Sequence, residues 1–144
     1  MATPARRHRW LAEHADRPLE SEVRLWTLEI EEEVQRFLEN LSDDEYGTVS
    51  FHAERLAEAG RGLTEPYVKR LEHQVFELRP KAFRITFLVD DARHTVVMLT
   101  AFRKTRDNDV RQKERAYRAA EQCLSHHSGA REHDVWSRTT KGGR

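Results

Sequence analysis

The stretch from Lys69 to Thr105 constrains the fold of this chain more than any other, because it reads as three consecutive β-strands joined by tight turns. Valine, isoleucine, phenylalanine and threonine dominate its runs, and clusters containing proline or aspartate separate them. That composition is typical of a half-buried antiparallel sheet. The sequence therefore predicts strands over residues 74–79, 83–89 and 94–102, with turns at 80–82 and 90–93.

The register of the first hairpin follows from its turn. With Lys81 and Ala82 at the tip, large apolar residues meet on one face and the other face is polar near the turn. The predicted pairs are Arg79–Arg84, Glu77–Thr86 and Val75–Leu88 on one face, and Leu78–Ile85 and Phe76–Phe87 on the other. Two opposed guanidiniums repel unless Glu77 or an external anion lies between them. The alternative is a solvated arginine pair beside a loop.

The N-terminal half predicts a strand followed by two helices. Residues 23–30 alternate as a strand does, and residues 31–41 carry an apolar stripe at helical spacing. Ser42 and Glu45 form a capping box for a second helix, and Gly60 stands where a left-handed C-terminal cap is expected. We expect these two helices to form an antiparallel hairpin packed on the sheet.

A last helix is predicted from Val110, capped by Asn108 or Asp109. Its apolar stripe consists of Ala116, Ala119, Ala120, Cys123 and Leu124. Residues 1–22 are predicted to be a flexible arm and residues 125–144 a flexible tail, which leaves residues 23–124 as the folded domain. The fold class is therefore α+β: an N-terminal strand and a two-helix hairpin packed on a small antiparallel sheet, with a C-terminal helix.

Composition indicates a cytoplasmic protein. The chain has no apolar run of membrane-spanning length, and its N-terminus lacks the hydrophobic region of a secretory signal. Its single cysteine, Cys123, cannot form an internal disulfide, which fits a reducing compartment. We expect no membrane association.

The net charge of zero conceals a segregation of charge along the chain. Residues 1–60 hold 7 Lys/Arg against 14 Asp/Glu, whereas residues 61–118 hold 14 against 8. A basic sheet favours a polyanionic partner. The alternative, which we weigh equally, is that the acidic helices neutralise the basic sheet internally.

The motifs exclude several kinds of chemistry. The chain has no P-loop, no dinucleotide-binding glycine pattern, no HExxH and no setting for a serine or cysteine nucleophile. His126, His127 and His133 lack a fourth partner at zinc spacing, so we expect no metal and no cofactor. The candidate site residues are therefore cationic, with one histidine: Lys69, Arg70, His73, Arg79, Arg84, Arg103 and Lys104.

Such a set suits RNA cleavage by the RNA's own 2′-hydroxyl, which needs neither a protein nucleophile nor a metal. We expect Arg84 to clamp the phosphate and Arg79 to share it, because arginine binds phosphate with two parallel hydrogen bonds. Lys69 and Lys104, each beside an arginine, are candidates for proton transfer, as is His73. A second turn at Asp91 and Ala92 would place Arg103, and not Lys104, on the face of Arg84.

Three segments resemble the RelE/HigB branch of the RelE/ParE toxin superfamily: ELRP, FRITF and LTAFRKT, followed by a charged helix. The resemblance runs from about Trp26 to Leu124 and departs at Arg103, where many relatives have an aromatic, an aliphatic or a lysine. It implies a RelE-like microbial RNase fold, a metal-independent endonuclease acting on mRNA at the ribosome, and a helix-turn-helix antitoxin partner. It favours Lys104 over Arg103 as a site residue.

RNA-binding contacts are expected from Arg70, Lys81, Arg106 and Arg111. Two other functions stay open at this point. One is a toxin of the ParE kind, which binds a protein target such as gyrase and cleaves nothing. The other is a non-catalytic adaptor that binds nucleic acid or protein.

Overall fold

The computed structural model describes residues 24–125 and 134–136, and it confirms the predicted α+β fold class. The elements, in chain order, are β1 (Thr27–Ile30), α2 (Glu32–Glu39), α3 (Asp43–Ala59), a 3-10 turn η1 (Gly60–Gly62), β2 (Val68–Arg70), β3 (Phe76–Leu78), β4 (Phe83–Asp90), β5 (Thr95–Arg103), α4 (Asp109–Ser125) and β6 (Asp134–Trp136). The predictions for residues 1–22, and for His126, His127 and His133, lie outside the described residues.

The sheet is mixed, in the order β2-β3-β4-β5-β1-β6. Strands β2 to β5 pair antiparallel, as predicted for the region after Lys69, but β1 pairs with β5 in parallel, so the expectation of an antiparallel sheet was wrong for this strand. A parallel neighbour needs a long crossover, and α2, α3 and the first three strands after them supply it. Strands β2 and β6 were not predicted, because three residues are too few to show an alternation.

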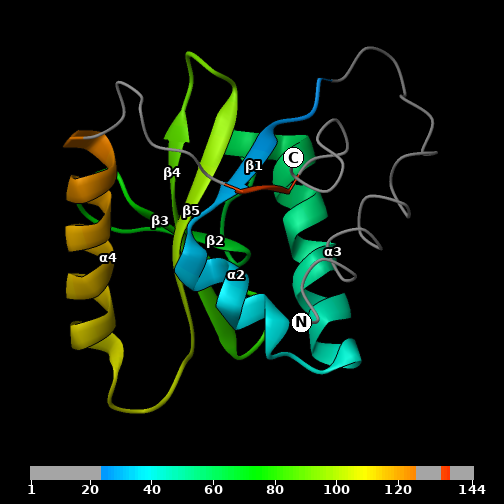
Figure 1. Cartoon of the computed structure of the whole chain (residues 1–144), viewed down its shortest axis with the longest axis vertical. Coiled ribbons are helices and arrows are strands. Elements are labelled where there is room, and N and C mark those ends of the chain that lie inside the picture. Colours follow the sequence, from blue (N-terminus) through cyan, green and yellow to red (C-terminus); the bar gives the residue numbers. More distant parts are fainter. Residues whose placement is uncertain (1–23, 126–133, 137–144) are drawn as a thin grey trace.

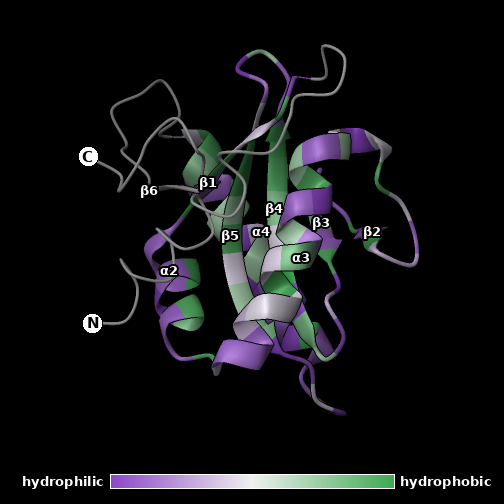
Figure 2. Ribbon diagram, turned by 90° about the vertical axis from the view of Figure 1, so that its right-hand side faces the viewer, coloured by the Kyte–Doolittle hydropathy of each residue, from purple (hydrophilic) through white to green (hydrophobic). Residues whose placement is uncertain are grey.

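Helices cover both faces of the sheet. Figure 1 shows α4 alone on one side of the strands, with α2 and α3 on the other. The larger core lies under α2 and α3 and includes Leu28, Ile30 and Phe87, while a smaller one under α4 includes Leu88 and Leu99. Hydrophobic residues accordingly concentrate on β4 and β5 between the helices (Figure 2). This arrangement follows from the alternation of side chains along each strand.

The helix signals in the sequence are confirmed at most positions. Ser42 and Glu45 form the predicted capping box, with the Ser42 Oγ accepting from the Glu45 N–H at 3.1 Å and the Ser42 N–H donating to the Glu45 carboxylate at 2.9 Å. The bond from the Ser42 N–H, and after it one from the Arg103 guanidinium, hold the pKa of the Glu45 carboxyl below its ordinary value. The prediction was wrong for Leu124, which is 50% exposed because its turn of α4 extends beyond the apolar residues of the smaller core.

A β-bulge interrupts the pairing of β4 with β5. Phe87 pairs with Met98 but Thr86 pairs with Thr100, so β5 contains one extra residue, Leu99, at this point. An extra residue reverses which side chains face which side for the rest of the strand. Everything on β5 after Leu99 therefore lies on the face opposite to the one that simple alternation predicts.

Gly60 generates a stability prediction. Its φ is +54°, and a Cβ built there would lie 2.2 Å from the indole Nε1 of Trp26. Gly60→Ala should lower the free energy of unfolding by roughly 2–4 kcal/mol, because the left-handed backbone and the collision both oppose a side chain. Urea unfolding followed by circular dichroism measures this change.

The matched control is Gly47→Ala, at an exposed position in the second turn of α3, where nothing lies within 4 Å of an added Cβ. Alanine there should raise the free energy of unfolding by about 1 kcal/mol, since glycine is a poor helix former. Equal changes for the two variants would contradict the role given to Trp26.

Candidate functional site

A row of polar residues crosses the face of the sheet that carries α4. Lys69 pairs with Glu77, Glu77 with Thr86, and Thr86 with Thr100. Glu77, Thr86 and Thr100 are all buried, and the two threonine hydroxyls lie 2.6 Å apart. A buried polar row of this kind is costly unless its members bond one another. It therefore forms a fixed polar floor beside the apolar contacts of α4.

Two arginines converge on this floor. The register predicted for the first hairpin is confirmed by the pairs Glu77–Thr86 and Leu78–Ile85, and its next step places Arg79 opposite Arg84. The Arg79 Nε lies 3.2 Å from the Glu77 Oε1, and the Arg84 Nε lies 3.9 Å from the same oxygen. Glu77 thus lies between the two guanidiniums, which was one of the two arrangements that would relieve their repulsion.

The Arg84 guanidinium is held tightly but is not neutralised. Its Nη1 donates to the carbonyls of Lys81 and Phe83, both at 2.7 Å, while its buried Nε has no hydrogen-bond partner among the described residues. Burial, and then the nearby Arg79 charge, lower the pKa of Arg84. A second anion at this point would relieve both effects, because it would share the donors and offset the positive charge.

The bulge determines which of Arg103 and Lys104 shares the face of Arg84. Simple alternation predicted Arg103, and that prediction was wrong. Arg103 pairs with Phe83, on the face of α2 and α3, where its Nη2 donates to Glu45 at 3.0 Å and its guanidinium lies over the Phe83 ring. The Lys104 N–H donates to the Ala82 carbonyl at 2.8 Å, which continues the pairing by one residue. By alternation, Lys104 shares the face of Arg84, as the family resemblance favours.

We call Lys69, Glu77, Arg79, Arg84 and Lys104 the cationic cluster. Glu77 lies near both arginines and opposite Lys69, while the Lys104 Nζ donates to the Thr105 carbonyl at 2.9 Å. No ion pair of Lys69 or Lys104 is found within the described part of the chain. Opposed residues on neighbouring strands have Cβ atoms roughly 5 Å apart and diagonal ones roughly 7–8 Å. Arg79 and Arg84 are therefore close enough to bind one phosphate together, with Lys69 on β2 and Lys104 after β5 to either side of them.

Three of the predicted RNA-binding residues lie at the same end of the sheet as the cluster. Lys81 is exposed in the β3–β4 turn, Arg106 in the loop after Lys104, and Arg111 in the first turn of α4. Arg70 does not join them, because it pairs with Phe76 and its guanidinium lies over that ring, on the other face of the sheet. The structure thus separates Arg70 from the cluster.

His73 is also separated from the cluster. It lies in the turn between β2 and β3, at the far end of β3 from Arg79, and its ring packs edge-on against Tyr117 of α4 at 4.7 Å. It therefore does not contribute to the geometry around Arg84.

Glu77 is the residue that sequence reasoning did not place in the site. It was considered only as a spacer between two arginines, although its position opposite Lys69 makes it the centre of the cluster. The available signal was the ELR segment itself, which puts a carboxylate two residues before an arginine on a strand, and so on the same face.

Among residues 24–125 and 134–136, no group of three or more acidic, histidine or cysteine side chains could hold a metal ion.

Comparison with solved structures shows the class of fold. A chain of the archaeal RelE–RelB complex from Pyrococcus horikoshii matches with a TM-score of 0.50 and 18% identity, covering 57% of this chain and 98% of that one. A chain of the RelBE2 toxin–antitoxin complex of Mycobacterium tuberculosis gives a TM-score of 0.48 at 20% identity, covering 59% and 98% respectively. The isolated RelE toxin of E. coli gives 0.47 at 15%, covering 62% and 95%. The fold is RelE-like.

The sequence defines the family more closely. Residues 36–124, more than half of the chain, match the family described as phage-derived protein Gp49-like (DUF891), and the protein belongs to that family. The resemblance seen in the ELRP, FRITF and LTAFRKT segments is thereby confirmed. A search of curated protein sequences gave no match. None of the helices in the described residues is long and apolar enough to cross a membrane.

The opposite placement of Arg103 and Lys104 can be tested directly. Lys104→Ala should weaken binding of a short single-stranded RNA and reduce the slope of log K against log salt by about 0.7, the value of one phosphate contact. Arg103→Ala should leave affinity and slope nearly unchanged and cost about 0.5–1 kcal/mol of stability, since it removes the contacts with Glu45 and Phe83. Fluorescence anisotropy across a salt series separates the two, and the reverse ranking would refute the register.

A second prediction concerns Glu77. Glu77→Gln should lower the free energy of unfolding by roughly 1–3 kcal/mol, because it removes the carboxylate charge that lies between Arg79 and Arg84. Sulfate should then raise the melting temperature of the variant more than that of the wild type, since an anion can replace the carboxylate. The control is Glu32→Gln, which removes an exposed ion pair with Arg36. An equal response of both variants to sulfate would exclude an anion site at Arg79 and Arg84.

Proposed function

We propose that this protein is the toxin of a type II toxin–antitoxin system, and that it cleaves mRNA on the ribosome without a metal. The observation that carries the proposal is the cationic cluster, in which two arginines share one buried carboxylate and two lysines lie on the same face of a RelE-like sheet. The excess positive charge matches the charge that develops on a phosphate during in-line attack. The RelE fold supports a toxin role for such a site.

The chemistry divides among the members of the cluster. The 2′-hydroxyl loses its proton and attacks the adjacent phosphorus, the bond to the 5′-oxygen breaks, and that oxygen takes up a proton. In this proposal Arg84 and Arg79 bind the non-bridging oxygens, and Lys69 and Lys104 transfer the two protons. We assign Glu77 as a positioning residue, because one of its oxygens lies 3.2 Å from the Arg79 Nε and 3.9 Å from the Arg84 Nε. The fixed donors need no reorganisation as charge develops, which is the main source of catalysis at sites of this kind.

The partners of this function are the ribosome-bound mRNA and a cognate antitoxin. The solved structures that share this fold include RelE–RelB and RelBE2 toxin–antitoxin complexes. We propose a helix-turn-helix DNA-binding protein as the antitoxin here, as the family resemblance implies, and a cytoplasmic location for both.

A second candidate is a toxin of the ParE kind, which binds a protein target without cleaving RNA. One observation favours it: Glu77 already provides an acceptor for Arg79 and lies near Arg84, so the two arginines are stable without any ligand. Under this alternative the cluster is structural, and expression would stop DNA replication while translation continued. Pulse labelling of protein and DNA synthesis after induction distinguishes the two.

The decisive variant is Arg84→Ala. Cleavage of mRNA on purified ribosomes should fall roughly 10²–10³-fold, because the variant removes a donor aimed at the developing charge. Arg84→Lys should recover only part of the rate, since an ammonium keeps the charge but cannot make two parallel hydrogen bonds. Primer extension on a defined mRNA measures the rate.

Arg36→Ala is the matched control. It removes an arginine of α2 whose ion pair with Glu32 is exposed, and it should leave the rate unchanged. Circular dichroism melting of each variant separates loss of chemistry from loss of folding. Undiminished cleavage by Arg84→Ala would reject the catalytic assignment, whatever the target of the toxin.

A further inference from the structure

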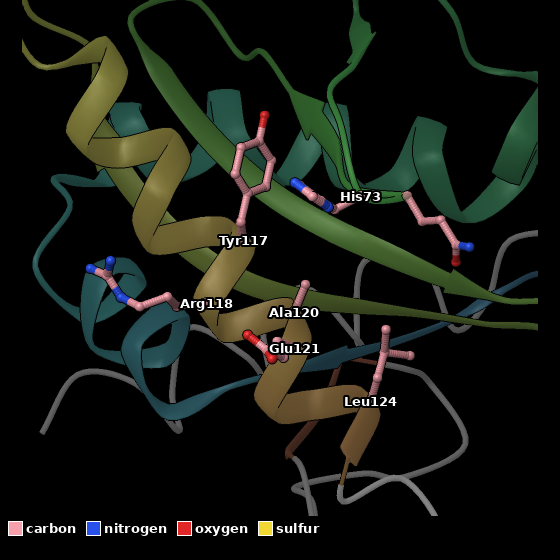
Figure 3. A pocket seen from close by; sticks show the side chains of 7 residues that line it. His73, Tyr117, Arg118, Ala120, Glu121 and Leu124 are labelled. Atoms are coloured by element: carbon pink, nitrogen blue, oxygen red, sulfur yellow. The ribbon is translucent and has the colours of Figure 1, made fainter.

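A concave site lies on the same side of the sheet as the cationic cluster, between α4 and the β2–β3 turn. It is an open pocket of about 500 Å³, within the range of about 300–1,000 Å³ that is usual for ligand sites. It is lined by His73, Gln74, Tyr117, Arg118, Ala120, Glu121 and Leu124. Figure 3 shows His73 and Tyr117 side by side at one end and Leu124 at the other, with Arg118 directed away.

The turn that forms one wall is built against local preference. His73 and Gln74 have φ values of 58° and 65°, and the Val75 N–H donates to the Glu72 carbonyl at 3.1 Å. A turn with positive φ at both central residues strongly prefers Asn-Gly there. Strained residues of this kind cluster at functional sites, and here the strain places an imidazole beside Tyr117.

We infer that this pocket binds a base of the RNA whose phosphate occupies the cationic cluster, and that it selects a base with an exocyclic amino group. The inference rests on the proposed function. Two aromatic side chains offer a stacking wall, and Ala120 with the half-exposed Leu124 offers an apolar floor. Flat bases bind single-strand sites through such surfaces.

The charges of the pocket favour a base over a second phosphate. Glu121 and Arg118 both belong to the lining, so it carries no excess of positive charge, and the Arg118 side chain is directed away from His73 and Tyr117 (Figure 3). A carboxylate repels phosphate but accepts a hydrogen bond from the amino group of cytosine, adenine or guanine, and uracil has no such group. The Gln74 amide can bond the rest of the base edge.

The spacing between the two sites fits one strand of RNA. Glu77 of the cluster and His73 of the pocket are four residues apart on one strand and its turn, which is roughly 10–13 Å. About three stacked nucleotides cover that distance at roughly 3.4 Å each. Lys69 lies on the same face beside this path, since it pairs with Glu77.

The test uses a fluorescent five-nucleotide RNA with 2′-O-methyl groups, which block attack, and a set in which each base in turn is replaced by an abasic site. The wild type should lose roughly tenfold in affinity at one position and much less at the others. At that position uracil should bind more weakly than cytosine, adenine or guanine, and Glu121→Gln should reduce this difference.

His73→Asn is the informative variant, because asparagine suits the left-handed backbone of the turn and should keep or raise the melting temperature. It should bind intact and abasic RNA with equal affinity. Misfolding would not explain this loss of sensitivity to the missing base. The control is His52→Ala, which removes a histidine that contacts the Phe51 and Tyr67 rings and belongs to α3, on the opposite side of the sheet.

The outcomes separate the two proposals. Binding without any abasic-sensitive position, or His73→Asn indistinguishable from wild type, would overturn the base pocket and leave the toxin proposal standing. Protection of His73 and Tyr117 by a purified antitoxin, together with a flat abasic series, would assign the pocket to a protein partner instead. No binding of RNA by the wild type at any salt concentration would overturn both.

Discussion

The bulged pairing of β4 with β5 is the constraint on which the site depends. These two strands form the centre of the sheet, and each side chain they present goes to one of two faces covered by different helices. Because β5 contains one extra residue opposite the Thr86–Phe87 step, the alternation reverses at Leu99. Arg103 is thereby committed to Glu45 of α3, and Lys104 to the face of Arg84. A regular strand would exchange the two.

Glu77 stabilises the cationic cluster when no ligand is bound, and it reduces the net positive charge of the cluster. Two guanidiniums at neighbouring strand positions repel, and the shared oxygen offsets this at 3.2 and 3.9 Å. The Arg84 Nε nevertheless has no hydrogen-bond partner among the described residues, and burial lowers the pKa of its guanidinium. The resting site is therefore held together but still favours an additional anion, which is the property that a phosphate-binding site needs.

The sequence was informative where local chemistry decides the structure. The hairpin register, the capping box at Ser42 and the buried stripe of α3 follow from neighbours a few residues apart, and they are confirmed. The bulge could not be predicted, because nothing in the sequence of β5 distinguishes Leu99 from the residues around it. The parallel pairing of β1 and the short strands β2 and β6 were missed because they depend on contacts far apart in the chain. The central position of Glu77 in the cluster and the separation of His73 from Arg84 were missed for the same reason.

The segregation of charge along the sequence has two consequences in the fold, and they do not exclude each other. Arg93, Arg103 and Arg115 pair with Glu29, Glu45 and Glu33 of the acidic N-terminal half, so part of the basic half is neutralised internally. The Arg115–Glu33 pair joins α4 to α2 with two bonds of 2.8 Å, and the Glu33 carboxylate also accepts the Ala101 N–H of β5 at 3.3 Å. These pairs fix the helices on both sides of the sheet.

The basic residues of the cluster have only Glu77 as an ion-pair partner in the described part of the chain, so the positive field is confined to one end of one face. A confined field directs an incoming polyanion to the cluster more effectively than the same charge spread over the surface.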